Sequence, residues 1–289
     1  MSAVPGEGLS RFVESWSPPP EVVHDTLDPS SAAHLAATLD AGYRVEPGAP
    51  LPALWHWVYF NEWAPTAALG DDGHLREGRF LPPIPGRRRM FAGGRLQITA
   101  PLVLGVTAQR RSQVVAVTPK NGRSGAMLFV TIRQEYRQHG ELVLVEEQDV
   151  VYRSGDGGMP RAHTRSTQPF VESAGAQAIR PVTTAPLLFR FSALTANAHR
   201  IHYDHPYATA VEGYPDLVVH GPLLAIYMAD VAHRIAAHRT IVSFDYRLST
   251  PAFVGDPIEV TGSIDGDELT VKVVGSGGTQ HAAGRAVMR

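Results

Sequence analysis

The chain has 289 residues, of which 44% are hydrophobic, and its 26 basic and 28 acidic residues leave a formal charge of −2. This length allows two ordinary domains or one large one, and the balanced charge argues against a surface for nucleic acid or anionic membranes. Because the chain contains no cysteine, it has no disulfide framework, thiol nucleophile or Cys-ligated metal site, and a reducing, cytoplasmic location is expected.

The N-terminal 30 residues are expected to be partly irregular, with PPP at 18–20. They show neither a basic start nor an apolar core of signal-peptide length, and no apolar run approaches the roughly 18 residues of a membrane span. The sequence therefore predicts neither export by that route nor membrane insertion. Residues 30–42 (SSAAHLAATLDAG) predict a short helix, capped by Ser30 or Asp28 and ended by Gly42.

Two distant stretches of the chain repeat one pattern. Residues 96–109 (LQITAPLVLGVTAQ) and 246–259 (YRLSTPAFVGDPIE) align at a constant offset of 150 residues. The paired positions are Pro101 with Pro251 and Gly105 with Gly255. Each stretch predicts an alternating strand, then a proline that cannot lie within a sheet ladder, then a glycine turn into another strand.

The surroundings of the two stretches also repeat. Further strands are predicted at 112–119, 126–137 and 142–153 in the first half, and at 257–264, 268–275 and 281–289 in the second. One helix candidate precedes each repeat, over 52–64 and over 221–238. We predict an N-terminal domain over 1–155, a linker rich in Gly, Ser, Thr and Pro over 156–182, and a C-terminal domain over 183–289.

The residues that suggest chemistry lie in SALTANAHRIHYD (192–204) and VVHGPLLA (218–225). Their histidines could transfer protons, since an imidazole titrates near working pH. The free N–H groups at the start of a helix, expected here at Gly221 before Pro222, favour developing negative charge. His199, His202 and His205 lack the i, i+4 spacing of a helical zinc pair, so no metal is expected.

Together with PAFVGD (251–256), these stretches resemble the MaoC-like, (R)-specific enoyl-CoA hydratase family. The longer forms at 188–204 and 212–225 are closer to its two-domain branch, the mesaconyl-C4-CoA (3-methylfumaryl-CoA) hydratases and the type 2 hydroxyacyl-thioester dehydratases. The resemblance covers nearly the whole chain. It implies an α+β double hotdog, in which two antiparallel sheets each wrap a central helix.

The resemblance also implies three catalytic residues. The family motif, Ser-Gly-Asp-x-Asn-Pro-(Leu/Ile)-His-x-Asp, pairs an Asp with a His five residues later. His202 matches the His, Asn197 stands in the place of the Asp, and the N–H of Gly221 corresponds to the donor for the enolate-like oxygen. Because an amide cannot act as a base, Asn197 is expected to hold the attacking water while His202 moves the protons.

The candidate substrate-binding residues are His199, Arg190, Arg200, Asp204 and Arg88. His199 replaces a family Asn and could reach the site, and Asp204 could orient a histidine or merely cap a turn. Arg190 or Arg200 could hold a free carboxylate of the substrate. Arg88, within the run RRR at 87–89, could meet CoA phosphates, although a solvated basic turn is an equal alternative.

The predicted activity is that of a hydro-lyase acting on an α,β-unsaturated acyl thioester, with a short branched or dicarboxylic enoyl-CoA such as mesaconyl-C4-CoA as the first expectation. Two alternatives stay open: a hydroxyacyl-thioester dehydratase of fatty-acid synthesis, and a non-catalytic acyl-CoA-binding hotdog protein. The expected partner is the acyl-CoA substrate, with no nucleic acid, no membrane and no cofactor; a homodimer is possible. The N-terminal half lacks the motif and is expected to shape the acyl-CoA tunnel, and His56 and His220 are expected to be structural.

Overall fold

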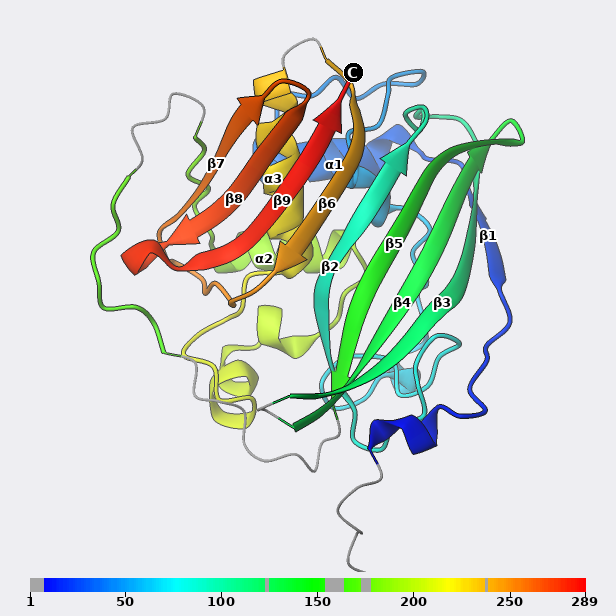
Figure 1. The fold of residues 1–289 in the computed structure, drawn as a ribbon, viewed down its shortest axis with the longest axis vertical. Helices are drawn as coiled ribbons and strands as arrows, with labels where there is room; N and C mark the ends of the chain where they lie inside the picture. Colours follow the sequence, from blue (N-terminus) through cyan, green and yellow to red (C-terminus); the bar gives the residue numbers. More distant parts are fainter. Residues whose placement is uncertain (1–7, 123–124, 154–163, 173–177, 237–238) are drawn as a thin grey trace, which may run out of the picture.

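The computed structural model describes residues 8–122, 125–153, 164–172, 178–236 and 239–289. Its described strands form one antiparallel sheet of nine strands in the order β1-β3-β4-β5-β2-β6-β9-β8-β7 (Figure 1). The strands are β1 (Glu21–Asp25), β2 (Arg88–Ile98), β3 (Ala108–Gly122), β4 (Gly125–Gln138), β5 (Glu141–Arg153), β6 (Ile241–Leu248), β7 (Ile258–Asp265), β8 (Glu268–Gly275) and β9 (Gln280–Met288).

Few helices accompany this sheet. The α-helices are α1 (Pro29–Leu39), α2 (Ala185–Leu194) and α3 (Gly221–Ala236), and the short helical turns are η1 (Leu9–Phe12), η2 (Trp55–Val58), η3 (Thr66–Ala68), η4 (Arg200–His202), η5 (Tyr207–Val211) and η6 (Ser276–Gly278). None of the helices in the described ranges has the length and apolar character needed to cross a membrane.

The repeat found in the sequence is visible in the backbone of both halves. The corresponding backbone hydrogen bonds are Gly105 N–H to Leu27 O and Gly255 N–H to Thr183 O, both 2.9 Å, and Leu51 N–H to Leu102 O (2.7 Å) and Val219 N–H to Ala252 O (2.8 Å). Gly105 and Gly255 adopt nearly the same left-handed conformation, with φ of 78° and 77°. The two halves are therefore built on one plan.

The two halves meet in the middle of the sheet, where β2 pairs with β6 (Figure 1). Gly93 and Gly94 lie within β2, opposite Arg247 and Tyr246. A Cβ at Gly93 would lie 2.3 Å from the carbonyl oxygen of Tyr246, so the close strand contact needs a residue without a side chain. Residues 156–163 and 173–177 of the predicted linker lie outside the described residues.

The helices match the sequence in part. The helix predicted over 221–238 is confirmed as α3, which packs across β6, β7, β8 and β9; residues 237–238 lie outside the described ranges. The helix predicted over 52–64 is wrong, because only the turn η2 forms there. Leu54 and Phe60 flank that turn in the left-handed region, with φ of 69° and 57°, which ends the helical conformation on both sides.

The short helix predicted over 30–42 is confirmed as α1. The carboxylate of Asp28 caps it by accepting from Ser30 N–H at 2.8 Å, and Asp40 rather than Gly42 takes the left-handed position at its end. α1 packs against α2, so the corresponding helices of the two halves lie together. The segment expected to be partly irregular contains the strand β1, which pairs with β3.

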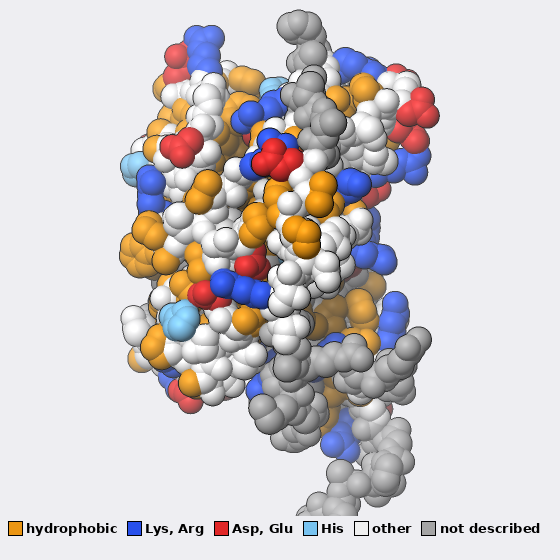
Figure 2. All heavy atoms as spheres, turned by 90° about the vertical axis from the view of Figure 1, so that its left-hand side faces the viewer, with side chains coloured by type: hydrophobic (Ala, Val, Ile, Leu, Met, Phe, Trp, Pro, Cys, Tyr) orange, Lys and Arg blue, Asp and Glu red, His pale blue; other side chains and the backbone are white. Residues whose placement is uncertain are grey.

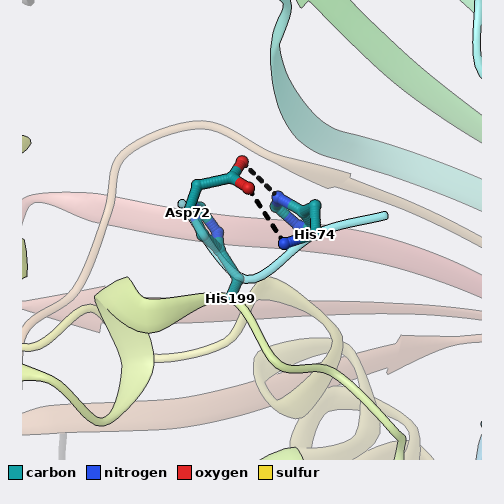
Figure 3. A group of neighbouring side chains, drawn as sticks. All are labelled: Asp72, His74 and His199. Atoms are coloured by element: carbon teal, nitrogen blue, oxygen red, sulfur yellow. Dashed lines mark hydrogen bonds and ion pairs between the residues drawn. The ribbon is translucent and has the colours of Figure 1, made fainter. Parts of the chain in front are cut away.

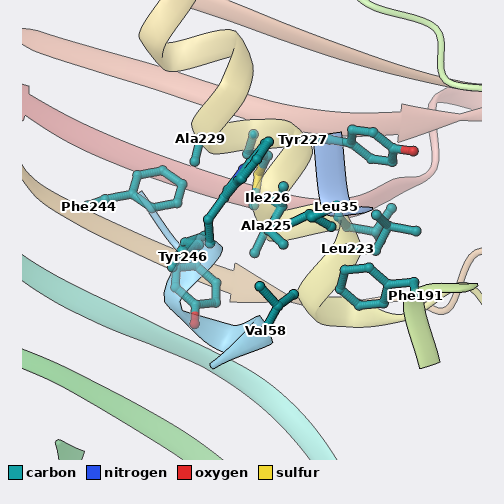
Figure 4. Close-up of a cluster of buried hydrophobic side chains, with 14 of the residues drawn as sticks. Leu35, Val58, Phe191, Leu223, Ala225, Ile226, Tyr227, Ala229, Phe244 and Tyr246 are labelled. Atoms are coloured by element: carbon teal, nitrogen blue, oxygen red, sulfur yellow. The ribbon is translucent and has the colours of Figure 1, made fainter. Parts of the chain in front are cut away.

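The main core lies on the helical side of the sheet, around α3 (Figure 4). Its buried side chains come from elements of both halves, including Leu35 on α1, Val58 on η2, Phe191 on α2, Ile226 on α3 and Phe244 on β6. On the outside, positive and negative side chains are interspersed over the face shown in Figure 2, without a patch of one sign.

Candidate active site

A cavity of about 2570 Å³ lies beside the start of α3 and is lined by residues of both halves. It exceeds the roughly 300–1,000 Å³ of an ordinary small-molecule pocket, so it has room for a long substrate. Five of the predicted site residues line it: His202, Asn197, Gly221, His199 and Arg88.

Three other predicted residues are placed elsewhere. Arg190 lines a separate cavity of about 580 Å³ between α1, α2 and α3. Arg200 donates from Nε (2.9 Å) and Nη2 (2.7 Å) to one carboxylate oxygen of Asp204, and neither residue lines the large cavity. Their positions give no support to the substrate-binding roles that the sequence suggested, because their charged groups are used outside that cavity.

His202 lies in η4 and is buried. Its Nδ1 is 2.7 Å from the carbonyl oxygen of Val218, which can only accept, so Nδ1 carries the hydrogen and Nε2 keeps a lone pair. Burial lowers the pKa of His202 to about 4, although the bond to Val218 opposes the shift. The ring is therefore neutral near pH 7 and its Nε2 can accept a proton.

The ring of His220 packs against the ring of His202. The two rings stack with centroids 3.6 Å apart and planes 18° apart, and His220 Nε2 is 2.8 Å from the hydroxyl of Ser192 on α2. Burial, and then the neighbouring His202 and His199, hold the pKa of His220 well below its usual value. The expectation that His220 is structural agrees with this packing. His205, by contrast, is exposed and lies 3.6 Å from Asp216, so the three histidines of the motif do not form one cluster.

Gly221 and Asn197 lie on either side of this imidazole in the sequence and on the wall of the same cavity. Gly221 is the first residue of α3, so its N–H has no acceptor within the helix. The Asn197 side-chain oxygen accepts from His199 N–H at 3.1 Å. Asn197 therefore keeps its amide N–H₂ group as a donor, while its oxygen is already engaged.

A second group, Asp72 and His74, which the sequence did not indicate, lies on a loop of the N-terminal half (Figure 3). The carboxylate of Asp72 accepts from His74 N–H and from His74 Nδ1–H, both at 2.9 Å. The His74 ring packs on that of His199, with centroids 4.1 Å apart, and His199 meets His202 edge-on at 5.7 Å. The letters DDGH at 71–74 carry no family motif, so only the fold reveals this contact.

Electrostatics keeps these imidazoles neutral and the carboxylate ionised. Burial, and next the charge of Arg89, lower the pKa of His74. Burial and then the neighbouring His74 and His202 lower that of His199 to about 2. Burial alone would raise the pKa of Asp72, but the hydrogen bonds from His74 hold it below its usual value. Ligand atoms of Asp72, His74 and His199 lie within 4.8 Å of one another, so among the described residues this group could hold a metal ion. The expectation of no metal was based only on the spacing of the histidines in the motif.

The loop that carries Asp72 is docked tightly on the segment that carries the motif. Gly73 has φ of +88°, and a Cβ there would lie 1.8 Å from the carbonyl oxygen of Ala198. The backbone N–H of Arg200 donates to Asp72 O at 2.9 Å, and the Arg200 side chain donates to Asp71 O. The two halves are thus in direct backbone contact at the site.

The N-terminal half has its own buried pair, His56 and Glu146, 2.8 Å apart. Glu146 also accepts from Trp57 Nε1–H (2.9 Å) and Gln148 Nε2–H (3.0 Å). Burial would raise the pKa of Glu146, but His56 and these donors hold it below its usual value. Since its oxygens are all engaged by protein groups, the pair fits the structural role expected for His56.

The sequence of the chain matches a family model and known proteins. A family model described as hydroxyacyl-thioester dehydratase type 2 matches residues 54–254. The chain is 43% identical over 265 residues to mesaconyl-C(4)-CoA hydratase of Chloroflexus aurantiacus, covering 91% of this chain and 93% of that protein. It is 27% identical over 283 residues to the mitochondrial hydroxyacyl-thioester dehydratase type 2 of Schizosaccharomyces pombe, covering 85% and 89%.

Solved structures confirm the fold. A MaoC-like dehydratase superposes with a TM-score of 0.69 at 16% identity, covering 95% of this chain and 99% of its own. A Mycobacterium tuberculosis protein described as having a double hotdog fold superposes with a TM-score of 0.57 at 15% identity, covering 98% and 99%. The predicted α+β double hotdog is therefore confirmed.

Proposed function

This chain belongs to the family of type 2 hydroxyacyl-thioester dehydratases, and on that premise we propose how its cavity adds water to an α,β-unsaturated acyl thioester and removes it again. The resemblance drawn from the C-terminal motif is confirmed by the family match and by the 43% identical relative. The chain is accordingly a hydro-lyase, which was the first of the predicted activities.

The proposed chemistry uses one imidazole and one backbone amide. In hydration, Nε2 of His202 takes a proton from water as the water oxygen bonds the β-carbon of the substrate. The electron pair of the double bond moves toward the thioester oxygen, which Gly221 N–H and the start of α3 stabilise. The proton then passes from His202 to the α-carbon, which completes the 3-hydroxyacyl thioester. The observation that carries this proposal is the hydrogen bond from His202 Nδ1–H to Val218 O, because it leaves the lone pair on Nε2. His202 and Gly221 line the same cavity.

The acyl group that we propose is a short dicarboxylic one, as in mesaconyl-C4-CoA. In a 3-methylfumaryl thioester the free carboxylate is attached to the β-carbon, the atom that water attacks. Its binding group must therefore lie next to the proton-transfer residues. Arg190 and Arg200 do not line that cavity.

Arg89 fits this requirement. It lines the cavity, and its charge lowers the pKa of His74 after the larger effect of burial. It also contributes to the lowered pKa of His199, after burial and the neighbouring His74 and His202. Among the described residues no carboxylate forms an ion pair with it, whereas Arg88 lies 3.8 Å from Glu212. We therefore assign the substrate carboxylate to Arg89, and Arg88 keeps its predicted role near the CoA phosphates.

Steady-state assays with two substrates test this assignment. For Arg89→Gln we expect kcat/KM for mesaconyl-C4-CoA to fall about 10- to 100-fold, as for the loss of one charged hydrogen-bonded pair, while that for but-2-enoyl-CoA, which has no carboxylate, changes little. Arg190→Gln is the matched control and should leave both values unchanged. Equal losses on both substrates would refute the assignment, and absence of turnover by the wild-type protein on any enoyl-CoA would refute the proposed function.

The alternative in fatty-acid synthesis predicts another order of substrates. Such an enzyme would prefer longer acyl chains carried on acyl carrier protein. A comparison of acyl lengths on both carriers decides between the two, and we expect the short CoA thioester with a carboxylate to be preferred because the 43% identical relative is a mesaconyl-C(4)-CoA hydratase.

A further inference from the structure

We propose that Asp72 and His74 of the N-terminal half complete the acid–base machinery of the C-terminal half, with His74 as a catalytic residue and Asp72 as its positioning residue. This inference rests on the hydration proposed above and extends it. It assigns chemistry to a half of the chain that lacks the catalytic motif.

The need for such a group arises at Asn197. In the motif that this chain resembles, a carboxylate stands there beside the catalytic histidine and offers a second acceptor of high basicity to the attacking water. The Asn197 oxygen already accepts from His199 N–H, and its N–H₂ group can only donate. Asn197 therefore does not supply the carboxylate acceptor that the motif places beside His202.

The Asp72–His74 pair has the chemistry that Asn197 lacks. Because the carboxylate of Asp72 accepts from Nδ1–H, the neutral His74 ring carries its lone pair at Nε2. This is the tautomer that Val218 also imposes on His202. A carboxylate bound to Nδ1–H also holds the ring in this tautomer and orientation, with Nε2 available to accept a hydrogen bond.

The position of the pair is fixed relative to the motif. His74, His199 and His202 line the same cavity, and His199 packs against the other two rings. Figure 3 shows Asp72 and His74 on one loop, facing each other next to His199 on the opposing segment. The contact of Gly73 with Ala198 and the Arg200–Asp72 backbone hydrogen bond leave this loop little freedom to move away.

In the hydration step, the two Nε2 atoms of His74 and His202 hold the two hydrogens of one water molecule. The water oxygen bonds the β-carbon while one O–H bond breaks, and that proton goes to His202 and then to the α-carbon. The other hydrogen stays on the oxygen as the product hydroxyl, bound to His74. One water is consumed, and no other reactant is required.

Replacement of Asp72 by the isosteric amide tests the pair. For Asp72→Asn we expect kcat to fall about 100-fold or more, with KM changed by no more than a few-fold, because the carboxylate acts on the reacting water through His74 and does not bind the acyl-CoA. Asp71→Asn, one residue away, exposed and not on the cavity wall, should retain wild-type kcat. Thermal melting of both variants checks that they are folded.

Two further variants separate chemistry from packing. His74→Gln should lose as much activity as Asp72→Asn, and the double variant should be no worse than either, since the two residues act as one unit. Asn197→Asp, made in the Asp72→Asn background, should restore kcat by at least about tenfold, because it returns a carboxylate to the motif. A residue with a purely structural role would not be rescued in this way.

The outcomes discriminate between the proposals. If the wild-type protein hydrates the substrate and Asp72→Asn is equally active, the pair has no part in catalysis and the proposed function stands. A loss that Asn197→Asp does not relieve overturns the inference. So does a stoichiometric metal ion in the purified wild-type protein that Asp72→Asn lacks, because the three residues would then be ligands. Absence of wild-type turnover would instead refute the hydratase function itself.

Discussion

The two halves of the chain share one backbone plan but use the middle of it differently. In both, a helix follows the residue that accepts from the repeated turn glycine: α1 follows Leu27, and α2 follows Thr183. In the C-terminal half the chain then makes the loop with His202 and continues into α3. In the N-terminal half the corresponding segment, 40–54, is shorter than the segment 195–220 between α2 and α3, and the place of α3 is taken by the turn η2.

The residues that the N-terminal half does not use for a long helix form the stretch 59–87, which contains the short turn η3. This stretch carries Asp72 and His74 to the motif of the other half, and it leads into Arg88 and Arg89 at the start of β2. The N-terminal half, although it lacks the motif, therefore contributes residues to the cavity. Because the stretch 59–87 does not form a long helix, it can reach the site of the other half.

The largest expected effect separates the histidines of the C-terminal half. His202→Ala should lower kcat by about two to four orders of magnitude, since it removes the proton-transfer group of the proposed reaction. His205→Ala is the matched control, because His205 is exposed and does not line the cavity. The loss of enoyl-thioester absorbance measures both. Near-wild-type activity of His202→Ala would remove His202 from the mechanism.

The next effect concerns the buried histidine–carboxylate pair of the N-terminal half, which we regard as structural. Glu146→Ala should lower the free energy of unfolding by about 3–5 kcal/mol, because His56 and Trp57 lose their buried partner. Its folded fraction should keep kcat within a few-fold. Denaturant unfolding of Glu146→Ala and Glu147→Ala makes the comparison, and Glu147, in ion pairs with partly exposed arginines, should cost no more than about 1 kcal/mol. A large loss of kcat with unchanged stability would show that this pair takes part in the chemistry.

The smallest effect is a pH dependence of stability. The pKa of His202 is about 4 in the folded protein, against about 6.5 in an unfolded chain. Between these pH values His202 binds a proton in the unfolded state but not in the folded state, so the free energy of unfolding falls as the pH drops from about 6.5 toward 4. Between pH 7 and 5 the wild-type protein should lose about 1–2 kcal/mol more than His202→Ala. Urea unfolding at several pH values measures this, and identical slopes would contradict the burial of a neutral His202.

Much of the architecture could be predicted from the sequence because it depends on local patterns. Strand alternation, the proline and glycine turns and the repeat at an offset of 150 identified both meanders and α3. The helix expected over 52–64 failed for a physical reason. The same spacing of apolar residues also fits a turn whose aromatic side chains enter the core. In addition, Trp57 and His56 form hydrogen bonds with Glu146, which is distant in the sequence.

The candidate site was accessible to sequence reasoning only where its residues are neighbours in the chain. The motif around His202 and Gly221 is contiguous enough to be recognised, and both residues line one cavity. Asp72 and His74 reach that cavity by a contact between distant segments, which no spacing rule reports. The sequence could not show that Arg190 lines a different cavity, or that Arg200 binds Asp204, because both placements depend on contacts made by the folded chain.

Because β2 of the N-terminal half pairs with β6 of the C-terminal half, each half covers a strand edge of the other. Separately produced halves would each expose an unpaired strand edge where β2 and β6 now meet, and such an edge can pair with strands of other chains. Heating or proteolytic cleavage should therefore unfold both halves together. If the two halves were encoded by separate genes, they would fold properly only if they associated soon after translation.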